Sequence, residues 1–277
     1  MYASSFLIPA FISIGLGTLM CLFIPSNEQE GTEWHTSIQR SNLVVLFAWI
    51  WGIFIGALPF YLSKQLTLFH SFFESVSGWT TTGLSVMNVV STPNIFLFHR
   101  SFMQYCGGLG FVLVMIVLVS GKHAMSLYNA EGHPDKLMPN IKRTVQTIFM
   151  IYNSFLIVGI IAYMLTGMPL FDSIMHAMCA LSTGGFSIKL NSIGDYHNIA
   201  TNIVTICLMF IGTTNFAILL LVFKRKFSQA FKTSEAKFMI IIFLVFVPLT
   251  TYILISQNSF SLLENLNQAS FGVASAL

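Results

Sequence analysis

The sequence has very little charge. Asp, Glu, Lys and Arg make up 8% of its 277 residues, whereas a soluble domain carries about 25%, and 55% of the residues are hydrophobic. Water is therefore not the main environment of this chain. Six stretches lack any charged residue, and each is long enough to cross a bilayer as a helix of about 20 residues. They are Met1–Asn27, Ser41–Ser63, Ser101–Gly121, Thr144–Phe171, Tyr196–Phe223 and Phe238–Leu263.

The uncharged stretches are continuously apolar rather than alternating. In hydrocarbon every backbone N–H and C=O group must find a partner within the protein, which leaves helices or closed barrels. Barrel strands would alternate between apolar and polar residues. The sequence therefore predicts an all-α membrane protein.

Several common motifs are missing. The four cysteines show no CxxC spacing, which argues against a disulfide framework or a zinc site. There is no GxSxG or HExxH motif of the kind that hydrolases use. Met1–Ile24 lacks a basic start and a small-x-small cleavage site, so we predict a retained helix rather than a signal peptide.

The net charge of +3 does not indicate nucleic-acid binding, because the basic residues follow the pattern of a membrane protein. Gly121–Arg143 contains four Lys or Arg and Lys224–Lys237 contains five, so the positive-inside rule places both loops in the cytoplasm. Because consecutive crossings alternate in direction, the polar loop Pro25–Gln39 lies on the same side as the basic loops. Ser63–Arg100 and Gly167–Asn198 are then expected to open to the opposite side, the periplasm.

An internal repeat organises the chain. The apolar segment Leu66–Trp79 is too short to span a membrane, and Thr80–Ser85 follows it, a β-branched and glycine-containing stretch suited to extended backbone. The same pattern returns as Phe171–Leu181 followed by Ser182–Ser187. A third copy begins with a crossing at Phe238–Ser256 and a short segment at Leu262–Leu277, which ends where we expect a third such stretch to start.

A half-helix followed by irregular backbone at membrane depth is tolerated where it is buried in protein or lines a watery cavity. Backbone carbonyls there could replace the hydration shell of a cation, and the carboxyl ends of the half-helices would add partial negative charge. Close helix packing, which also uses Thr and Gly, is the alternative. The predicted ion-binding residues are Thr80, Thr81, Thr82, Gly83 and Leu84 in the first copy and Ser182, Thr183, Gly184, Gly185 and Phe186 in the second.

The sequence resembles the TrkH branch of the Trk/Ktr/HKT superfamily of potassium transporters, in which one chain carries four consecutive pore units. The extra amino-terminal crossing favours the TrkH branch over the KtrB branch. The matching residues are Gly56–Phe60, Phe72–Ser75, Ser77-Gly78, Thr80–Gly83, Gln104, Gly107–Gly110, Gly167–Asp172, His176, Gly184–Ser187 and Ser192–Tyr196.

The resemblance implies that Gly83 and Gly185 are selectivity-filter glycines and that potassium is the transported substrate, without a tightly bound cofactor or an enzymatic activity. It further implies a multi-pass protein of the bacterial inner membrane that forms a homodimer and binds a cytosolic nucleotide-binding regulatory subunit (TrkA-like). The third and fourth filters and the basic residue of the last unit have no counterpart in these residues, so we expect the chain alone not to conduct selectively.

The predicted organisation has five parts. A leading helix and cytoplasmic loop (1–39) precede the first pore unit (40–121), a cytoplasmic loop (122–143), the second pore unit (144–223), and a cytoplasmic loop with part of a third unit (224–277). A non-conducting scaffold from a split or truncated gene is the alternative function.

Four polar residues allow more than one interpretation. Glu74 is the only acidic residue of the first half-helix; it is either functional, or it is paired with a neighbouring half-helix or faces the outer vestibule. His176 occupies the equivalent place in the second copy and is expected to be a hydrogen-bonded core residue rather than a ligand. Asp172, His176 and Ser182 would suit an intramembrane hydrolase, but they are not part of the repeated pattern.

Glycines near the filters also have two interpretations. Gly107, Gly108 and Gly110 either form a hinge or allow close packing of a helix against a filter. Gly212 and Asn215 are expected to play the same part in the second unit.

Overall fold

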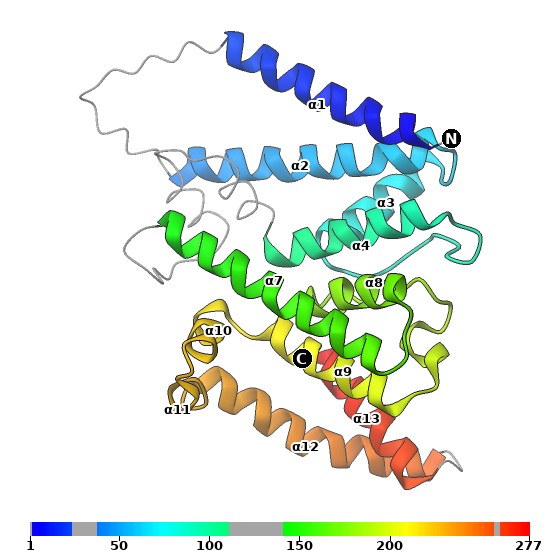
Figure 1. The fold of residues 1–277 in the computed structure, drawn as a ribbon, viewed down its shortest axis with the longest axis vertical. Coiled ribbons are helices and arrows are strands. Elements are labelled where there is room, and N and C mark those ends of the chain that lie inside the picture. Colours follow the sequence, from blue (N-terminus) through cyan, green and yellow to red (C-terminus); the bar gives the residue numbers. More distant parts are fainter. Residues whose placement is uncertain (1, 24–37, 111–140, 258–260) are drawn as a thin grey trace.

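The computed structural model describes residues 2–23, 38–110, 141–257 and 261–277, and every regular element within them is a helix (Figure 1). The prediction of an all-α membrane protein is thereby confirmed. The elements are α1 (Ala3–Phe23), α2 (Ile38–Leu62), α3 (Leu68–Trp79), α4 (Asn94–Leu109), α7 (Ile141–Leu165), α8 (Leu170–Leu181), the 3-10 helix η1 (Ser192–Tyr196), α9 (Ile199–Thr213), α10 (Phe216–Phe223), α11 (Phe227–Ala230), α12 (Ser234–Gln257) and α13 (Leu262–Ala276).

Four of the described helices, α1, α2, α7 and α12, are long and apolar enough to cross a membrane. The bent pair of α9 and α10 adds a fifth if it counts as one span. The predicted crossing Ser101–Gly121 is described only in its first half, which belongs to α4. The rest of that crossing and most of the basic loop Gly121–Arg143 lie outside the described residues.

The two predicted half-helices correspond to helices that are too short to span a membrane. Both α3 and α8 have 12 residues, which at 1.5 Å per residue gives about 18 Å. The half-helices predicted in the two copies are therefore present, although the first begins at Leu68, after Thr67 as its amino-terminal cap, rather than at Leu66.

Each half-helix packs between two longer helices. α3 contacts α2 and α4, and α8 contacts α7 and α9, so the repeat seen in the sequence is also a repeat in space (Figure 1). α4 also packs against α8 and joins the two units. The third half-helix, α13, contacts α12 and α9.

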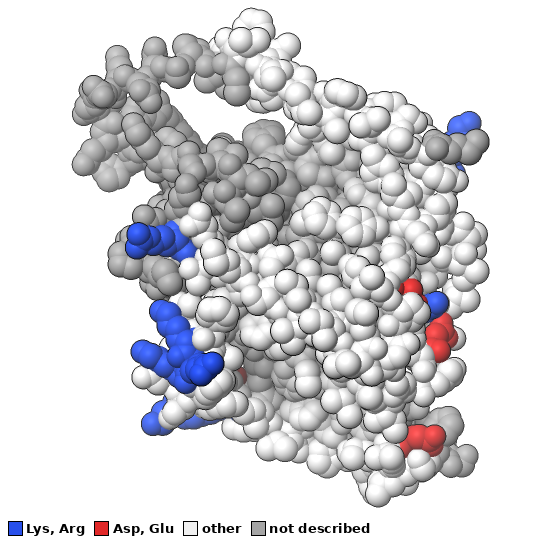
Figure 2. Space-filling model, viewed as in Figure 1, with Lys and Arg blue, Asp and Glu red and all other residues white. Residues whose placement is uncertain are grey.

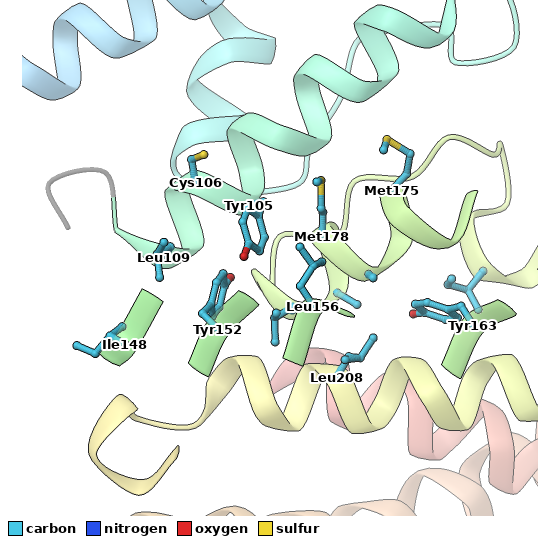
Figure 3. Packing of buried hydrophobic residues seen from close by; sticks show 14 of the residues in the cluster. Tyr105, Cys106, Leu109, Ile148, Tyr152, Leu156, Tyr163, Met175, Met178 and Leu208 are labelled. Carbon is cyan, nitrogen blue, oxygen red and sulfur yellow. The ribbon is translucent and has the colours of Figure 1, made fainter. Parts of the chain in front are cut away.

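The main hydrophobic core lies where the two units meet. Most of its residues come from α4, α7, α8 and α9, and Tyr105 and Tyr152 face each other within it (Figure 3). The rings of these two tyrosines are stacked with centroids 4.9 Å apart. Because α4 belongs to the first unit and α7 to the second, this core fixes the position of one unit against the other.

The structure corrects the predicted crossing Tyr196–Phe223. The chain bends by 113° between α9 and α10 instead of continuing as one straight helix. Thr213 and Thr214 direct their hydroxyl groups to carbonyls one turn back, and the Asn215 side chain accepts a hydrogen bond from the backbone N–H of Ala217 and starts a new helix. Side chains that compete for backbone partners in this way favour a helix boundary.

Most of the Lys and Arg side chains visible in Figure 2 gather at one end of the molecule. The basic segment Lys224–Lys237 lies around α11 at the end where α7 and α12 begin, on the left of Figure 1. Asp172 and Glu264 lie toward the other end, where the half-helices begin. This arrangement fits the predicted topology, in which the basic end faces the cytoplasm.

Candidate functional site

The half-helix α3 ends in a tight turn that opens the first filter segment (Thr80–Leu84). The backbone N–H of Thr81 donates to the carbonyl of Gly78 at 3.1 Å, and that of Thr82 donates to Ser77 at 3.0 Å. These two bonds define a Schellman motif, which requires a left-handed residue just after the helix.

The half-helix α8 ends in the same way and opens the second filter segment (Ser182–Phe186). Thr183 donates its N–H to Ala180 at 3.1 Å, and Gly184 donates to Cys179 at 3.1 Å. Bond for bond, the second turn repeats the first. The two segments are therefore equivalent in backbone structure as well as in sequence.

Left-handed backbone recurs at every second residue of both segments. Thr81 and Gly83 have φ angles of 54° and 81°, and Thr183 and Gly185 have φ angles of 55° and 74°. A positive φ is ordinary for glycine but strained for a β-branched residue, at about 1–3 kcal/mol. The β-branched composition predicted extended backbone here, and the structure differs because the turn that ends each half-helix imposes the left-handed conformation.

The two segments have different surroundings. Thr80 and Ser182 cap the carboxyl ends of the half-helices. In the last position, Leu84 exposes 62% of its surface whereas Phe186 exposes 2%. The second segment is thus the more enclosed of the two within the described part of the chain.

Three glycines bring the flanking helices against the half-helix ends. A Cβ atom at Gly107 would strike the carbonyl of Trp79, and one at Gly212 would strike the carbonyl of Leu181. A Cβ at Gly108 would overlap Ser182. Trp79 and Leu181 are the last residues of the two half-helices, so α4 and α9 make the same close approach in each unit. The structure supports packing rather than a hinge at these positions.

The two filter segments touch each other through backbone atoms. A Cβ at Gly83 would strike the carbonyl of Gly184, whereas the corresponding space at Gly185 is open. Gln104 of α4 lies directly behind Gly184 and accepts a hydrogen bond from the N–H of Phe186 at 3.0 Å. Gln104 is fully buried, so α4 of the first unit braces the second segment.

Glu74 is the centre of a buried polar network. It accepts hydrogen bonds from the hydroxyl of Ser85 at 2.9 and 3.1 Å and from the N–H of Val86 at 3.1 Å. Its Oε1 atom lies 3.0 Å from Nε of Arg100, and both side chains are almost completely buried. Glu74 is therefore paired, but its partner comes from α4 and not from a neighbouring half-helix as expected.

Arg100 is the polar residue that the sequence analysis missed. From α4 it donates a hydrogen bond to the carbonyl of Ser187 at 3.0 Å, and its guanidinium group lies 4.0 Å from the ring centroid of Phe186. The sequence offered one signal. Arg100 is an isolated arginine directly before an uncharged run, and the preceding half-helix contains one acidic residue, Glu74. Its partners in the second unit could not be found from local spacing.

The residues of the suggested hydrolase site do not come together as a triad. Asp172 accepts a hydrogen bond from Tyr196 at 2.7 Å and forms an ion pair with Lys189 at 3.4 Å. Ser182 donates to the carbonyl of Cys179. His176 is buried beside a cavity of about 160 Å³ that Gly185, Phe186 and residues of α13 also line, and its Nε2 atom has no hydrogen-bond partner in the described part of the chain.

The turn after the second segment is fixed by local hydrogen bonds. Asn191 donates its side-chain and backbone N–H groups to Asp195 at 2.7 and 3.2 Å, which lowers the pKa of that exposed carboxyl group. Burial, followed by the hydrogen bond to Asp172, raises the pKa of Tyr196. Tyr196 is therefore protonated at neutral pH and acts as a donor that ties the turn to α8.

The chain is similar to known cation transport proteins. The family model for TrkH, a cation transport protein, matches residues 16–274. The Trk system potassium uptake protein TrkH of Salmonella typhimurium is 31% identical over 276 residues, covering 96% of this chain and 56% of the relative. The Trk system potassium uptake protein TrkG of Escherichia coli K12 is 32% identical over 220 residues, covering 76% of this chain and 45% of the relative.

A solved structure is also similar to this chain. The crystal structure of the potassium transporter TrkH from Vibrio parahaemolyticus matches 99% of this chain and 57% of that chain, with a TM-score of 0.80 and 27% sequence identity. The chain thus spans about half the length of the curated relatives that it matches.

Proposed function

The chain belongs to the TrkH family of cation transport proteins, and we propose that it supplies two pore units of a potassium-uptake pathway. The family is one of transporters rather than enzymes, and the apolar helices make the chain a multi-pass membrane protein. The two filter segments, Thr80–Leu84 and Ser182–Phe186, are proposed to line the pathway.

The repeated left-handed backbone is the observation that carries this proposal. In a regular strand successive carbonyls point to opposite sides, as the side chains do. Left-handed residues at every second position, as at Thr81 and Gly83 or Thr183 and Gly185, turn alternate peptide groups over and let neighbouring carbonyls face one side. Two copies with this geometry beside each other suit a carbonyl-lined cation site.

The energetic requirement explains why such a site is needed. Moving an ion from water into a medium of low dielectric has an idealised cost on the order of 20 kcal/mol. Carbonyl oxygens replace hydration water without introducing a fixed charge. The half-helices α3 and α8 end directly at the two segments, and each carboxyl end carries about −0.5 charge. A cation is favoured there over an anion.

Potassium is the proposed substrate because the named relatives are potassium uptake proteins. We propose the bacterial inner membrane as the location, a homodimer as the assembly, and a cytosolic nucleotide-binding subunit as the partner of the basic end around Lys224–Lys237. The predicted domain limits, 1–39, 40–121, 122–143, 144–223 and 224–277, belong to the same proposal.

A potassium-uptake-deficient bacterium provides the test. Expression of the transporter that contains this chain should restore growth at low external potassium and allow uptake of rubidium as a tracer. The scaffold alternative predicts a stable membrane protein without rescue. An absence of rescue, with the protein present in the membrane in normal amount, would reject transport in favour of that alternative.

A further inference from the structure

The buried pair of Glu74 and Arg100 lies between the two filter segments rather than within one of them. Glu74 comes from the half-helix α3, and its Ser85 and Val86 partners follow the first segment. Arg100 comes from α4, and its further contacts, Phe186 and Ser187, belong to the second segment and the residue after it. One ion pair thus connects the backbone that leaves the first filter to the backbone that leaves the second.

Arg100 has three contacts at once, and they use different parts of its side chain. Nε lies 3.0 Å from Glu74 in an ion pair, one terminal nitrogen donates to the carbonyl of Ser187 at 3.0 Å, and Cζ of the guanidinium group lies 4.0 Å from the centroid of the Phe186 ring. A planar group with several fixed donors can satisfy all three, whereas the ammonium group of lysine cannot stack or bind in two directions with the same geometry.

The second unit has no equivalent pair. His176 occupies the place of Glu74, and when Gly212 is set against Gly107, Thr205 occupies the place of Arg100. Thr205 forms a hydrogen bond with Tyr163 at 2.8 Å instead. The first unit therefore contains an ion pair that the second unit lacks, and the repeat alone does not account for it.

We propose that Arg100 is a positioning residue that holds the second filter segment in register with the first, and that Glu74 neutralises its charge so that cations can enter the site. This inference rests on the proposed function of the two segments. It assigns different tasks to the two residues: the contacts of Arg100 set selectivity, and the charge of Glu74 sets the rate of cation entry.

The two tasks have different physical causes. Without the carboxylate, a buried guanidinium would place an uncompensated positive charge behind Phe186, where low dielectric makes repulsion of an incoming cation strong. Without the guanidinium group, the Ser187 carbonyl loses a hydrogen-bond donor and the Phe186 ring loses its contact with the cation. Breaking one side of a buried ion pair is strongly destabilising, so uptake must be measured per folded transporter.

Four variants of the complete transporter test the proposal through rubidium uptake with sodium as competitor. Glu74→Gln keeps a hydrogen-bond acceptor and removes the charge, and it should lower the maximal uptake rate about tenfold or more. The double variant Glu74→Gln with Arg100→Gln removes both charges and should recover most of that rate. It should still admit more sodium than the wild type.

Arg100→Lys is the variant that isolates geometry, because it keeps the positive charge. It should retain a rate near that of the wild type but lose discrimination against sodium. Lys189→Gln is the matched control, because it removes the more exposed ion pair with Asp172 and should change neither quantity. Size-exclusion chromatography of each variant gives the amount of folded protein for normalisation.

The outcomes separate this inference from the proposed function. If the wild type transports rubidium selectively, but Arg100→Lys and the double variant discriminate against sodium as well as the wild type does, the positioning role is wrong. If the double variant transports as slowly as Glu74→Gln, the charge-balance role is wrong. A wild type that does not transport at all would instead contradict the proposed function.

Discussion

Thr81 and Thr183 share a left-handed backbone conformation, with φ angles of 54° and 55°, at the same place in the two repeats. Each stands one residue beyond the helix cap, where most proteins place glycine. Because the strain occurs in both units with the same hydrogen bonds, it is part of the structure that the two units share. Strained residues of this kind gather where geometry serves function.

Replacing either threonine by glycine tests this strain. A left-handed conformation costs a residue with a Cβ about 1–2 kcal/mol, so Thr81→Gly and Thr183→Gly should leave the free energy of unfolding unchanged or raise it by about 1 kcal/mol. The looser backbone should at the same time weaken discrimination against sodium. Thermal unfolding in detergent and sodium-competed rubidium uptake would measure both effects. A clear loss of stability would show that packing of the threonine side chains outweighs backbone strain.

Close packing at Gly212 gives a second prediction. The carbonyl of Leu181 occupies the space that a Cβ would need, so Gly212→Ala should lower the free energy of unfolding by about 1–3 kcal/mol. Gly17→Ala is the control, because no atom lies within 4 Å of the added carbon. Denaturation monitored by circular dichroism should separate the two variants. Equal stability would mean that α9 can move away from α8 at little cost.

Gln104 gives a third prediction. Gln104→Leu would leave the buried N–H of Phe186 without its acceptor, a loss of about 1–3 kcal/mol, and should relax selectivity by loosening the second segment. Gln104→Glu keeps an acceptor oxygen at the same place and should preserve the hydrogen bond to Phe186. The pair is compared by thermal unfolding and by sodium-competed uptake. If the leucine variant were as stable and as selective as the wild type, the bracing role would be refuted.

Topology can be tested without any transport assay. Reporter fusions placed after Lys142 and after Asn191 should report opposite sides of the membrane, with Lys142 in the cytoplasm, because the basic ends of the helices stay inside. The crossing α7 separates the two positions. Reports from the same side would overturn the assignment of α8 as a half-helix that enters and leaves on one face.

Much of this architecture follows from local sequence patterns. The lengths of α3 and α8 are visible as apolar runs too short to span, and the register of Gly83 with Gly185 is visible because the same small residues recur around them. The bend after α9 was not predicted, since the run Tyr196–Phe223 is uncharged throughout and hydropathy alone cannot show where a helix stops. Threonine hydroxyls and the cap at Asn215 decide that point.

The polar core of the site was the hardest part to foresee. Glu74 and Arg100 are distant in the chain, and Arg100 reaches Ser187 in the other unit. Such contacts depend on how α4 packs against α8, which no periodicity encodes. The left-handed threonines were missed for a related reason, because the propensity of β-branched residues for strands was overridden by the turn that ends each half-helix.

Potassium selectivity of glycine variants is the most direct test of the filter segments. Gly83→Ser and Gly185→Ser place a side chain on left-handed backbone within the two filter segments, with the greater disruption at Gly83, where the Gly184 carbonyl blocks the added carbon. Gly167→Ser is the control, because Gly167 also has a positive φ, of 91°, with open space around it, but lies before α8 and outside the segments. In sodium-competed rubidium uptake by the transporter that contains this chain, both filter variants should lose discrimination against sodium, Gly83→Ser the more strongly, while Gly167→Ser keeps it. Unchanged discrimination in both filter variants would show that these segments do not line the ion pathway.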